Sequence, residues 1–158
     1  MAKQTWKPGN MIYPLPAVMV SVGNPEGDTN IITIAWTGTI CTNPAMLYIS
    51  VRPERHSYSM IKETGEFVIN LTTSDLAYAT DWCGVKSGRD VDKWKEMKLT
   101  PVKAEKLEFA PMIDECPVQI HGLEIPREGY KKFRRTLNGY AVVYVVKGPD
   151  EDLHQKNR

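Results

Sequence analysis

Short runs of apolar and β-branched residues, separated by turn-forming residues, do most to limit the fold of this chain. Each run is only a few residues long, which is typical of a strand and too short for a buried helix. The runs are Leu15–Val22, Asn30–Trp36, Ala45–Val51, Glu66–Leu71, Pro101–Ala104, Cys116–Leu123 and Tyr140–Val146. Gly23–Asp28 has the composition of a hairpin loop, and Pro44 interrupts ladder pairing. The chain is therefore predicted to contain about seven short strands.

Three segments between these runs have helical patterns. The first, His56–Glu63, has apolar positions on one face and is followed by Gly65, which suits a left-handed helix end. The second begins at Thr72–Asp75, whose polar side chains can cap it. The third is Val91–Met97, where apolar residues recur every three positions. Short strands with short helices predict a mainly β fold, a closed antiparallel barrel decorated by helices.

Composition favours one soluble domain over the whole chain, residues 1–158. The three cysteines, Cys41, Cys83 and Cys116, form no CxxC pair, and no histidine lies at metal-ligand spacing, so we expect no metal site. A formal net charge of +1 shows no overall attraction to nucleic acid or membranes. No run is long and apolar enough for a signal peptide or a membrane span, which predicts a cytoplasmic protein.

A phosphate-binding site is predicted where the third run ends and the first helix begins. The strand ends at Ser50, Val51 and Arg52, and the helix start brings Arg55, His56 and Ser57. Guanidinium groups, hydroxyls and the free N–H groups of a helix start are the donors that a dianionic phosphate requires. The sequence leaves open an alternative in which both arginines pair with surface carboxylates such as Glu54.

Two other segments offer polar groups without bulky side chains. Thr37, Gly38, Thr39 and Ile40 form a predicted loop whose backbone could meet the edge of a flat ring, although an ordinary turn has the same composition. Trp36 could stack on such a ring or belong to the core. The Gly-containing run from Ser87 to Lys93 leads into the third helix, and Lys93 could reach a phosphate or remain solvated.

Three segments, in this order, resemble the flavin reductase-like and flavoredoxin family of FMN-binding split barrels. They are NIITIAWTGTICTNPAMLYISVRPERHSY at Asn30–Tyr58, GEFVINL at Gly65–Leu71 and SGRDVDKW at Ser87–Trp94. The resemblance implies a six-stranded Greek-key split barrel, a homodimer and one FMN per subunit. It also implies which residues surround FMN: Trp36, Thr37, Gly38, Thr39 and Ile40 along the ring and ribityl chain; Ser50, Val51, Arg52, Arg55, His56 and Ser57 near the ribityl-phosphate part; and Ser87 to Lys93 closing the site.

The function implied is an FMN-binding oxidoreductase or electron carrier, with NAD(P)H or a redox protein as the electron donor. The sequence has no GxGxxG motif for a Rossmann crevice and no nucleophile-base constellation, so no catalytic side chain is assigned. Neither is required, because the flavin carries the redox chemistry. The alternative is a non-catalytic homodimeric barrel that binds flavin weakly.

The segment from about residue 121 to 138 departs from the family pattern, because it lacks the Gly-Ser/Thr-His sequence of relatives. It is either a functional insertion or a scar in the gene, and the chain then ends sooner than relatives do. Five basic residues occur in it: Arg127, Lys131, Lys132, Arg134 and Arg135. They could bind an anionic partner such as RNA, but a solvated loop is the favoured interpretation.

Overall fold

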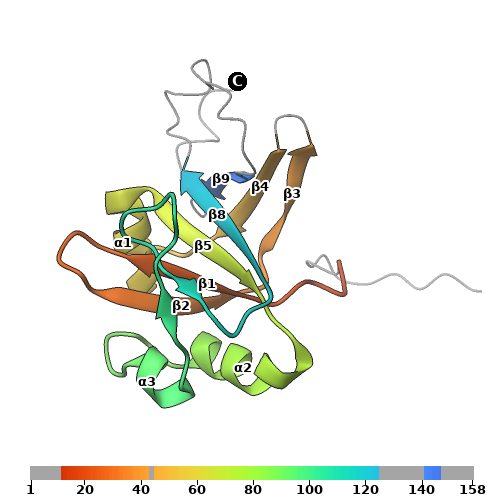
Figure 1. The fold of residues 1–158 in the computed structure, drawn as a ribbon. Coiled ribbons are helices and arrows are strands. Elements are labelled where there is room, and N and C mark those ends of the chain that lie inside the picture. The colour runs from red at the N-terminus through yellow and green to blue at the C-terminus, as the bar shows by residue number, and fades with distance from the viewer. Residues whose placement is uncertain (1–11, 43–44, 125–140, 147–158) are drawn as a thin grey trace, which may run out of the picture.

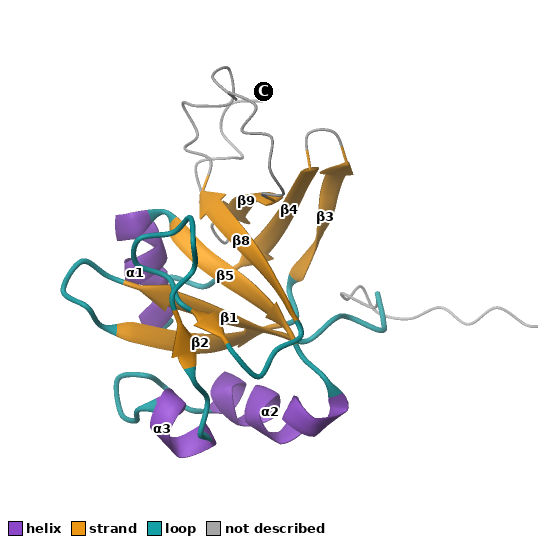
Figure 2. Cartoon of the chain, viewed as in Figure 1, coloured by secondary structure: helices purple, strands orange, loops and turns teal. Residues whose placement is uncertain are grey.

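The computed structural model describes residues 12–42, 45–124 and 141–146. Within them the chain forms a mainly β fold with short helices, as the sequence predicts (Figures 1 and 2). The elements are β1 Val18–Gly23, β2 Thr29–Ile34, β3 Thr37–Thr42, β4 Ala45–Ser50, α1 His56–Thr64, β5 Glu66–Leu71, the 3₁₀ turn η1 Ser74–Leu76, α2 Ala77–Val85, α3 Lys93–Met97, β6 Pro101–Val102, β7 Met112–Ile113, β8 Val118–Glu124 and β9 Ala141–Val146.

Seven of these strands form one sheet in the order β2-β1-β5-β8-β9-β4-β3. The first four strands pair antiparallel, whereas β9 runs parallel to both β8 and β4. The prediction of an antiparallel barrel is therefore wrong for β9, because strand direction there depends on a long connection that local patterning does not encode. The strands β2 and β3 lie at opposite ends of this order although they are consecutive in the chain.

The resemblance implied six strands, whereas the main sheet has seven. The prediction of a loop at residues 37–40 is also wrong. Thr37–Thr42 is a strand, β3, paired antiparallel with β4. Thr and Gly have turn composition, but Thr and Ile also suit a pleated strand. Gly38 fits because a Cβ there would lie 3.0 Å from the ring of Tyr48 on β4.

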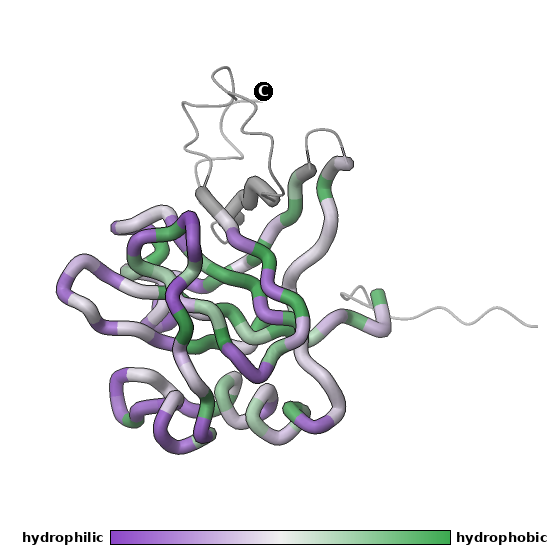
Figure 3. The backbone as a smooth tube through the Cα atoms, viewed as in Figure 1, coloured by the Kyte–Doolittle hydropathy of each residue, from purple (hydrophilic) through white to green (hydrophobic). Residues whose placement is uncertain are grey.

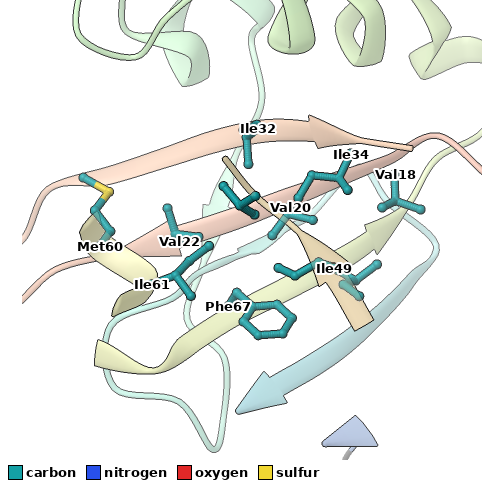
Figure 4. Packing of buried hydrophobic residues seen from close by; sticks show 11 residues of the cluster. Val18, Val20, Val22, Ile32, Ile34, Ile49, Met60, Ile61 and Phe67 are labelled. Carbon is teal, nitrogen blue, oxygen red and sulfur yellow. The ribbon is translucent and has the colours of Figure 1, made fainter. Parts of the chain in front are cut away.

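β1 is buried on both faces, and its side chains point alternately into two different hydrophobic clusters. Val18, Val20 and Val22 pack with the buried side of α1, including Met60 and Ile61, in the cluster of Figure 4. The other face contributes to a second cluster with the partly buried side chains of α2 and α3, which share one side of the sheet in Figure 2. Figure 3 shows hydrophobic positions along the central strands and hydrophilic ones on α3 and the loop before it. The period-2 pattern of one strand therefore places α1 opposite α2 and α3.

The predicted cap of the second helix is wrong. Thr73 is the N-cap residue of η1 and makes no side-chain cap hydrogen bond. The hydroxyl of Thr72 instead donates to the carbonyl of Ala17, at 3.1 Å. Threonine favours a helix start, but here a tertiary partner takes the hydroxyl that the prediction assigned to the helix.

Asn70, in the middle of β5, ties three segments together from a fully buried position. Its amide Nδ2 donates to the carbonyl of Met19 at 3.1 Å and to the hydroxyl of Ser21 at 2.9 Å. Its Oδ1 accepts from the backbone N–H of Ile113 at 3.0 Å. One buried amide thus links β1, β5 and β7, and all of its polar atoms have partners.

Glu66, at the start of β5, holds the loop that follows β6. Its carboxylate accepts from the backbone N–H groups of Glu108 at 3.1 Å, Phe109 at 2.8 Å and Ala110 at 3.3 Å. We expect Glu66→Gln to lower the free energy of unfolding by about 1–3 kcal/mol, because a neutral amide accepts these donors less strongly. Urea denaturation measures the loss, and Glu63→Gln, on an exposed position of α1, is the control. Equal midpoints for the two variants would contradict the role of Glu66.

Candidate functional site

A cleft opens at the start of α1 and is walled by β2 and by the loop between α2 and α3. Its lining residues are Asn30, Ile32, Glu54, Arg55, His56, Ser57, Cys83, Gly84, Val85, Lys86, Ser87, Gly88, Arg89 and Lys93. Five of the residues chosen from the sequence are among them: Arg55, His56, Ser57, Ser87 and Lys93. We call this the cationic cleft, because its basic side chains outnumber its single carboxylate, Glu54.

The start of α1 faces this cleft without a capping side chain. Arg55 is the N-cap residue in an extended conformation, with φ −74° and ψ 139°, and makes no side-chain cap hydrogen bond. The first N–H groups of a helix have no partner within the helix, and they attract anions. The helix start predicted from the sequence is confirmed, and Gly65 ends the helix with φ 68°, as predicted.

Asn30, which sequence reasoning missed, and Gly88, within the predicted Ser87–Lys93 loop, shape the cleft. Asn30 on β2 is buried, and its Nδ2 donates to the hydroxyl of Ser57 at 2.8 Å. Gly88 lies against this pair: a Cβ there would be 2.2 Å from Asn30 Oδ1 and 2.9 Å from the ring of His56. In the sequence, Asn30 is marked only as a polar amide at the start of an apolar strand run, and Gly88 as a glycine among charged residues. The loop between α2 and α3 can close on the cleft only because residue 88 has no side chain.

Positive charge concentrates around His56. Burial first, then the charges of Arg89 and Lys93, lower the pKa of His56 from its ordinary value, while Asp28 opposes them. The imidazole is therefore neutral at pH 7 and available as a hydrogen-bonding group. Arg89 spans the cleft, because its Nη1 donates to the backbone carbonyl of Glu54 at 3.1 Å. The site is thus prepared for an anionic group.

Lys93 occupies an unexpected environment. The sequence suggested a lysine that contacts a ligand or remains solvated, but its side chain is only 3% exposed. Its Nζ donates to the carbonyls of Ile31 at 2.6 Å and Cys83 at 2.7 Å. Burial lowers the pKa of Lys93 to about 8. The amine is therefore a buried link between β2 and α2 at the wall of the cleft.

A second cleft continues from the first along β2 and the end of β4. Its lining residues are Ile32, Thr33, Ile34, Ala35, Trp36, Ser50, Val51, Arg52, Arg55, Asp81, Gly84 and Val85. It shares Ile32, Arg55, Gly84 and Val85 with the cationic cleft. Trp36, 45% exposed, is at the surface rather than in the core, whereas the side chain of Val51 is buried in the main cluster. We call this the Trp36 cleft.

The remaining predicted residues lie along the β3–β4 hairpin. Thr37, Gly38, Thr39 and Ile40 are not among the lining residues of either cleft. The hydroxyl of Thr37 donates to the carbonyl of Tyr48 at 2.6 Å, within the hairpin. Ile40 is 48% exposed. The structure therefore brings Arg55, His56 and Ser57 together with the Ser87–Lys93 loop in the cationic cleft. It places residues 50–52 along the Trp36 cleft and residues 37–40 on the adjoining hairpin.

The cysteines with described side chains are shielded. Burial raises the pKa of Cys83, and it raises the pKa of Cys116 to about 11. Both are therefore thiols at pH 7, and we assign neither a chemical role.

Residues 12–42, 45–124 and 141–146 hold no group of three or more His, Cys, Asp and Glu side chains placed to bind a metal. Over the same ranges, no helix has the length and hydrophobicity needed to cross a bilayer. The basic residues from Arg127 to Arg135 lie outside the described residues, so their predicted contacts stay a prediction.

Comparison with known proteins agrees with this geometry. The fold is similar to flavoredoxin of Desulfovibrio vulgaris (Miyazaki F), with a TM-score of 0.72 and 30% identity, over 76% of this chain and 65% of that one. It is also similar to an FMN-binding protein from Thermus thermophilus, with a TM-score of 0.64 and 20% identity, over 77% and 65% of the two chains. An uncharacterized protein of Archaeoglobus fulgidus is 29% identical over 109 residues, 69% of this chain and 60% of that protein.

The chain thus spans slightly under two thirds of the length of each of these proteins. The model of the flavin reductase like domain matches residues 10–125, which include β1 to β8 and every residue that lines the two clefts. On that match, the chain belongs to the flavin reductase-like family of split-barrel proteins.

Proposed function

We propose that the protein is an FMN-binding oxidoreductase or electron carrier. The observation that carries the proposal is the continuity of the two clefts through Ile32, Arg55, Gly84 and Val85. One end is cationic, and the other combines an exposed tryptophan and aliphatic side chains with the polar Ser50 and Arg52. This arrangement suits a ligand with a phosphate at one end, a polar chain in the middle and a flat ring at the other end.

The residues present fit the phosphate of FMN. The uncapped start of α1 offers the backbone N–H groups of His56 and Ser57, and Arg55 brings a guanidinium to the same place. Ser87 and Lys93 line the opposite wall. Ser50 and Arg52 lie nearer the Trp36 cleft, where they would meet the ribityl chain. The N–H groups of the helix start and the Arg55 guanidinium form the donor set that binds a dianion at a helix start.

The ring of the flavin would occupy the Trp36 cleft. Trp36 offers an aromatic face, and Ile34 and Ala35 line the cleft beside it. The β3 residues Thr37 to Ile40 would pass along the outer side of the ring with their backbone groups. Contact with the side chains of Trp36, Ile34 and Ala35 would favour the flat ring over bulk solvent.

FMN, when bound, supplies hydride and electron transfer, and this chain supplies position and electrostatics. Guanidinium and helix N–H groups neutralise the phosphate, so the anionic end fixes the ligand in one direction. The neutral His56 adds a hydrogen bond without a further charge. We propose NAD(P)H or a redox protein as electron donor, a homodimer as the assembly and a Greek-key closure of the barrel, as expected from the family.

The phosphate contribution gives the sharpest test. We expect FMN to bind more tightly than riboflavin by roughly tenfold or more, because charged hydrogen bonds to phosphate are strong. Arg55→Ala is expected to reduce this preference sharply, whereas Lys62→Ala, on the exposed side of α1, leaves it unchanged. Fluorescence titration of the purified protein with each flavin measures both affinities. Equal binding of FMN and riboflavin by the unaltered protein would contradict the phosphate site.

Turnover is a separate question and needs a separate measurement. NADH or NADPH is mixed with the FMN-loaded protein, and nicotinamide oxidation is followed by absorbance. Oxidation above the rate of free FMN supports the oxidoreductase. A protein that binds FMN but oxidises neither nucleotide would act as an electron carrier with another donor. A protein that binds no flavin would instead be the non-catalytic barrel, and the proposal would be wrong.

A further inference from the structure

Lys93 is a buried lysine at the first position of a short surface helix, and this position needs an explanation. Burying an ammonium is costly unless its hydrogen bonds are replaced. Lys93 is 3% exposed, and two backbone carbonyls replace the lost water. The adjacent Asp92 caps α3 by accepting from the N–H groups of Trp94 and Lys95, so the helix start that carries Lys93 is itself fixed.

One of the two carbonyls lies at a helix end and the other on an edge strand of the sheet. Cys83 lies in the last turn of α2, where helix carbonyls have no partner within the helix and the negative end of the dipole favours a cation. Ile31 lies on β2, an edge strand with β1 on only one side. The ammonium of Lys93 therefore joins the end of α2 to the free edge of the sheet.

The hydrogen bonds of Lys93 also fix the base of the loop between α2 and α3. It starts just after α2 ends at Val85 and finishes at Lys93, so the link to Cys83 closes its base. At its tip, Gly88 sits against Asn30 and His56, and Arg89 donates to the carbonyl of Glu54 across the cleft. A loop whose base is fixed retains this position with a smaller loss of conformational entropy when a ligand binds.

We propose that Lys93 is a positioning residue, which holds the Lys86–Asp92 loop closed on the cationic cleft by clamping α2 to β2. The proposal deepens the function proposed above, because it assigns how the chain keeps the phosphate end assembled. Lys93 acts here through backbone carbonyls and the loop that they anchor. Its effect is therefore present before any ligand binds.

The clamp also makes ligand affinity depend on pH. The groups that face Lys93 are the Cys83 thiol on α2, Arg55 before α1 and His56 at its start. The pKa of Lys93 is lowered to about 8, while that of His56 is lowered from its ordinary value, so His56 stays neutral above pH 7. A bound dianion favours the ammonium, so FMN affinity is highest below about pH 8 and falls as pH rises above it. The phosphate itself is fully ionised there, since its second pKa is about 6.

The first test uses the protein without flavin. Lys93→Met keeps the length of the apolar stem but removes the donors, and Lys95→Met on the exposed side of the same helix is the matched control. Hydrogen exchange of residues 86–92 is expected to accelerate about tenfold or more in Lys93→Met, because the base of the loop is released, and to stay unchanged in Lys95→Met. Unchanged exchange in Lys93→Met would overturn the proposal, whatever the protein binds.

The second test is a double-mutant cycle on FMN affinity with Gly88→Ala. If both residues act through the position of one loop, Lys93→Met lowers affinity by about tenfold in the original protein and much less once Gly88→Ala has displaced the loop. Additive losses would show that Lys93 contacts the phosphate independently and would overturn the positioning role. If neither the original protein nor any of the variants binds FMN, the proposed function is wrong. The hydrogen-exchange result would still test the role of Lys93.

The third test measures the pH dependence of FMN affinity, and its first part uses the protein without any substitution. FMN affinity of the unaltered protein is measured from about pH 7 to about pH 9.5 and is expected to fall above about pH 8. Folded Lys93→Met, checked by circular dichroism, should show a flat profile over the same range. A decline of equal size in the variant would assign the titration to another group and contradict the clamp.

Discussion

Replacing Asn70 with alanine is expected to lower the free energy of unfolding by about 3–5 kcal/mol. The substitution removes the amide that donates to Met19 and Ser21 and leaves the backbone N–H of Ile113 without its acceptor. An unpaired polar group in a buried site costs more than the lost hydrogen bond contributed. Asn70 is also fully buried between strands, so water cannot replace the amide without a local rearrangement.

Equilibrium urea unfolding followed by tryptophan fluorescence measures this loss. Asn24→Ala is the matched control, because Asn24 is only partly buried and the hydrogen bonds that the structure describes for its side chain stay within its own turn, to Asp28. We expect that control to cost about 1 kcal/mol or less. Losses of similar size in the two variants would show that the buried amide network of β1, β5 and β7 contributes little to stability.

Gly88→Ala is expected to weaken FMN binding by about tenfold to a hundredfold while leaving the rest of the fold intact. A Cβ at this position overlaps Asn30 Oδ1, and Asn30 cannot move easily because its amide is held by the buried hydroxyl of Ser57. The loop must therefore shift away from His56 and open the cationic cleft. Small displacements of positioning groups have large effects on binding and catalysis.

Fluorescence titration with FMN measures the affinity, and thermal unfolding measures stability in the same samples. Gly23→Ala gives the opposite pattern as a control, because its Cβ would lie 2.1 Å from the carbonyl oxygen of Phe109, and neither residue lines the two clefts. That variant should lose stability and retain the affinity of its folded fraction. If Gly88→Ala binds FMN as the original protein does, the loop does not close the site.

Local sequence was sufficient to predict those helices and strands whose burial and ends are determined by their own residues. β1 and β5 are apolar and β-branched because both of their faces are buried, and the sequence pattern predicted them directly. The start of α1 and its end at Gly65 were also predicted, since a helix terminus is marked by residues within one turn of it. The predicted residues near the start of α1 consequently lie together in the structure.

Features that depend on distant partners could not be predicted in the same way. β3 is a strand because β4 pairs with it and Tyr48 covers Gly38, whereas its own composition equally suits a turn. Lys93 is buried because an edge carbonyl of β2 and the end of α2 meet its side chain, and neither contact is visible in the run that contains it. Asn30 was overlooked because its partner, Ser57, is 27 residues away.

The shielding of Cys116 affects how the protein withstands oxidants. Peroxides and disulfides attack the thiolate, and a thiol with a pKa of about 11 is ionised to roughly one part in ten thousand at pH 7. Cys83 is fully buried as well, and its raised pKa reduces its thiolate population in the same direction. Both residues lie in the second hydrophobic cluster, where a buried thiol behaves as a small apolar side chain that reacts slowly. Oxidative damage to this chain is therefore directed to its exposed groups before it reaches the wall of the cleft.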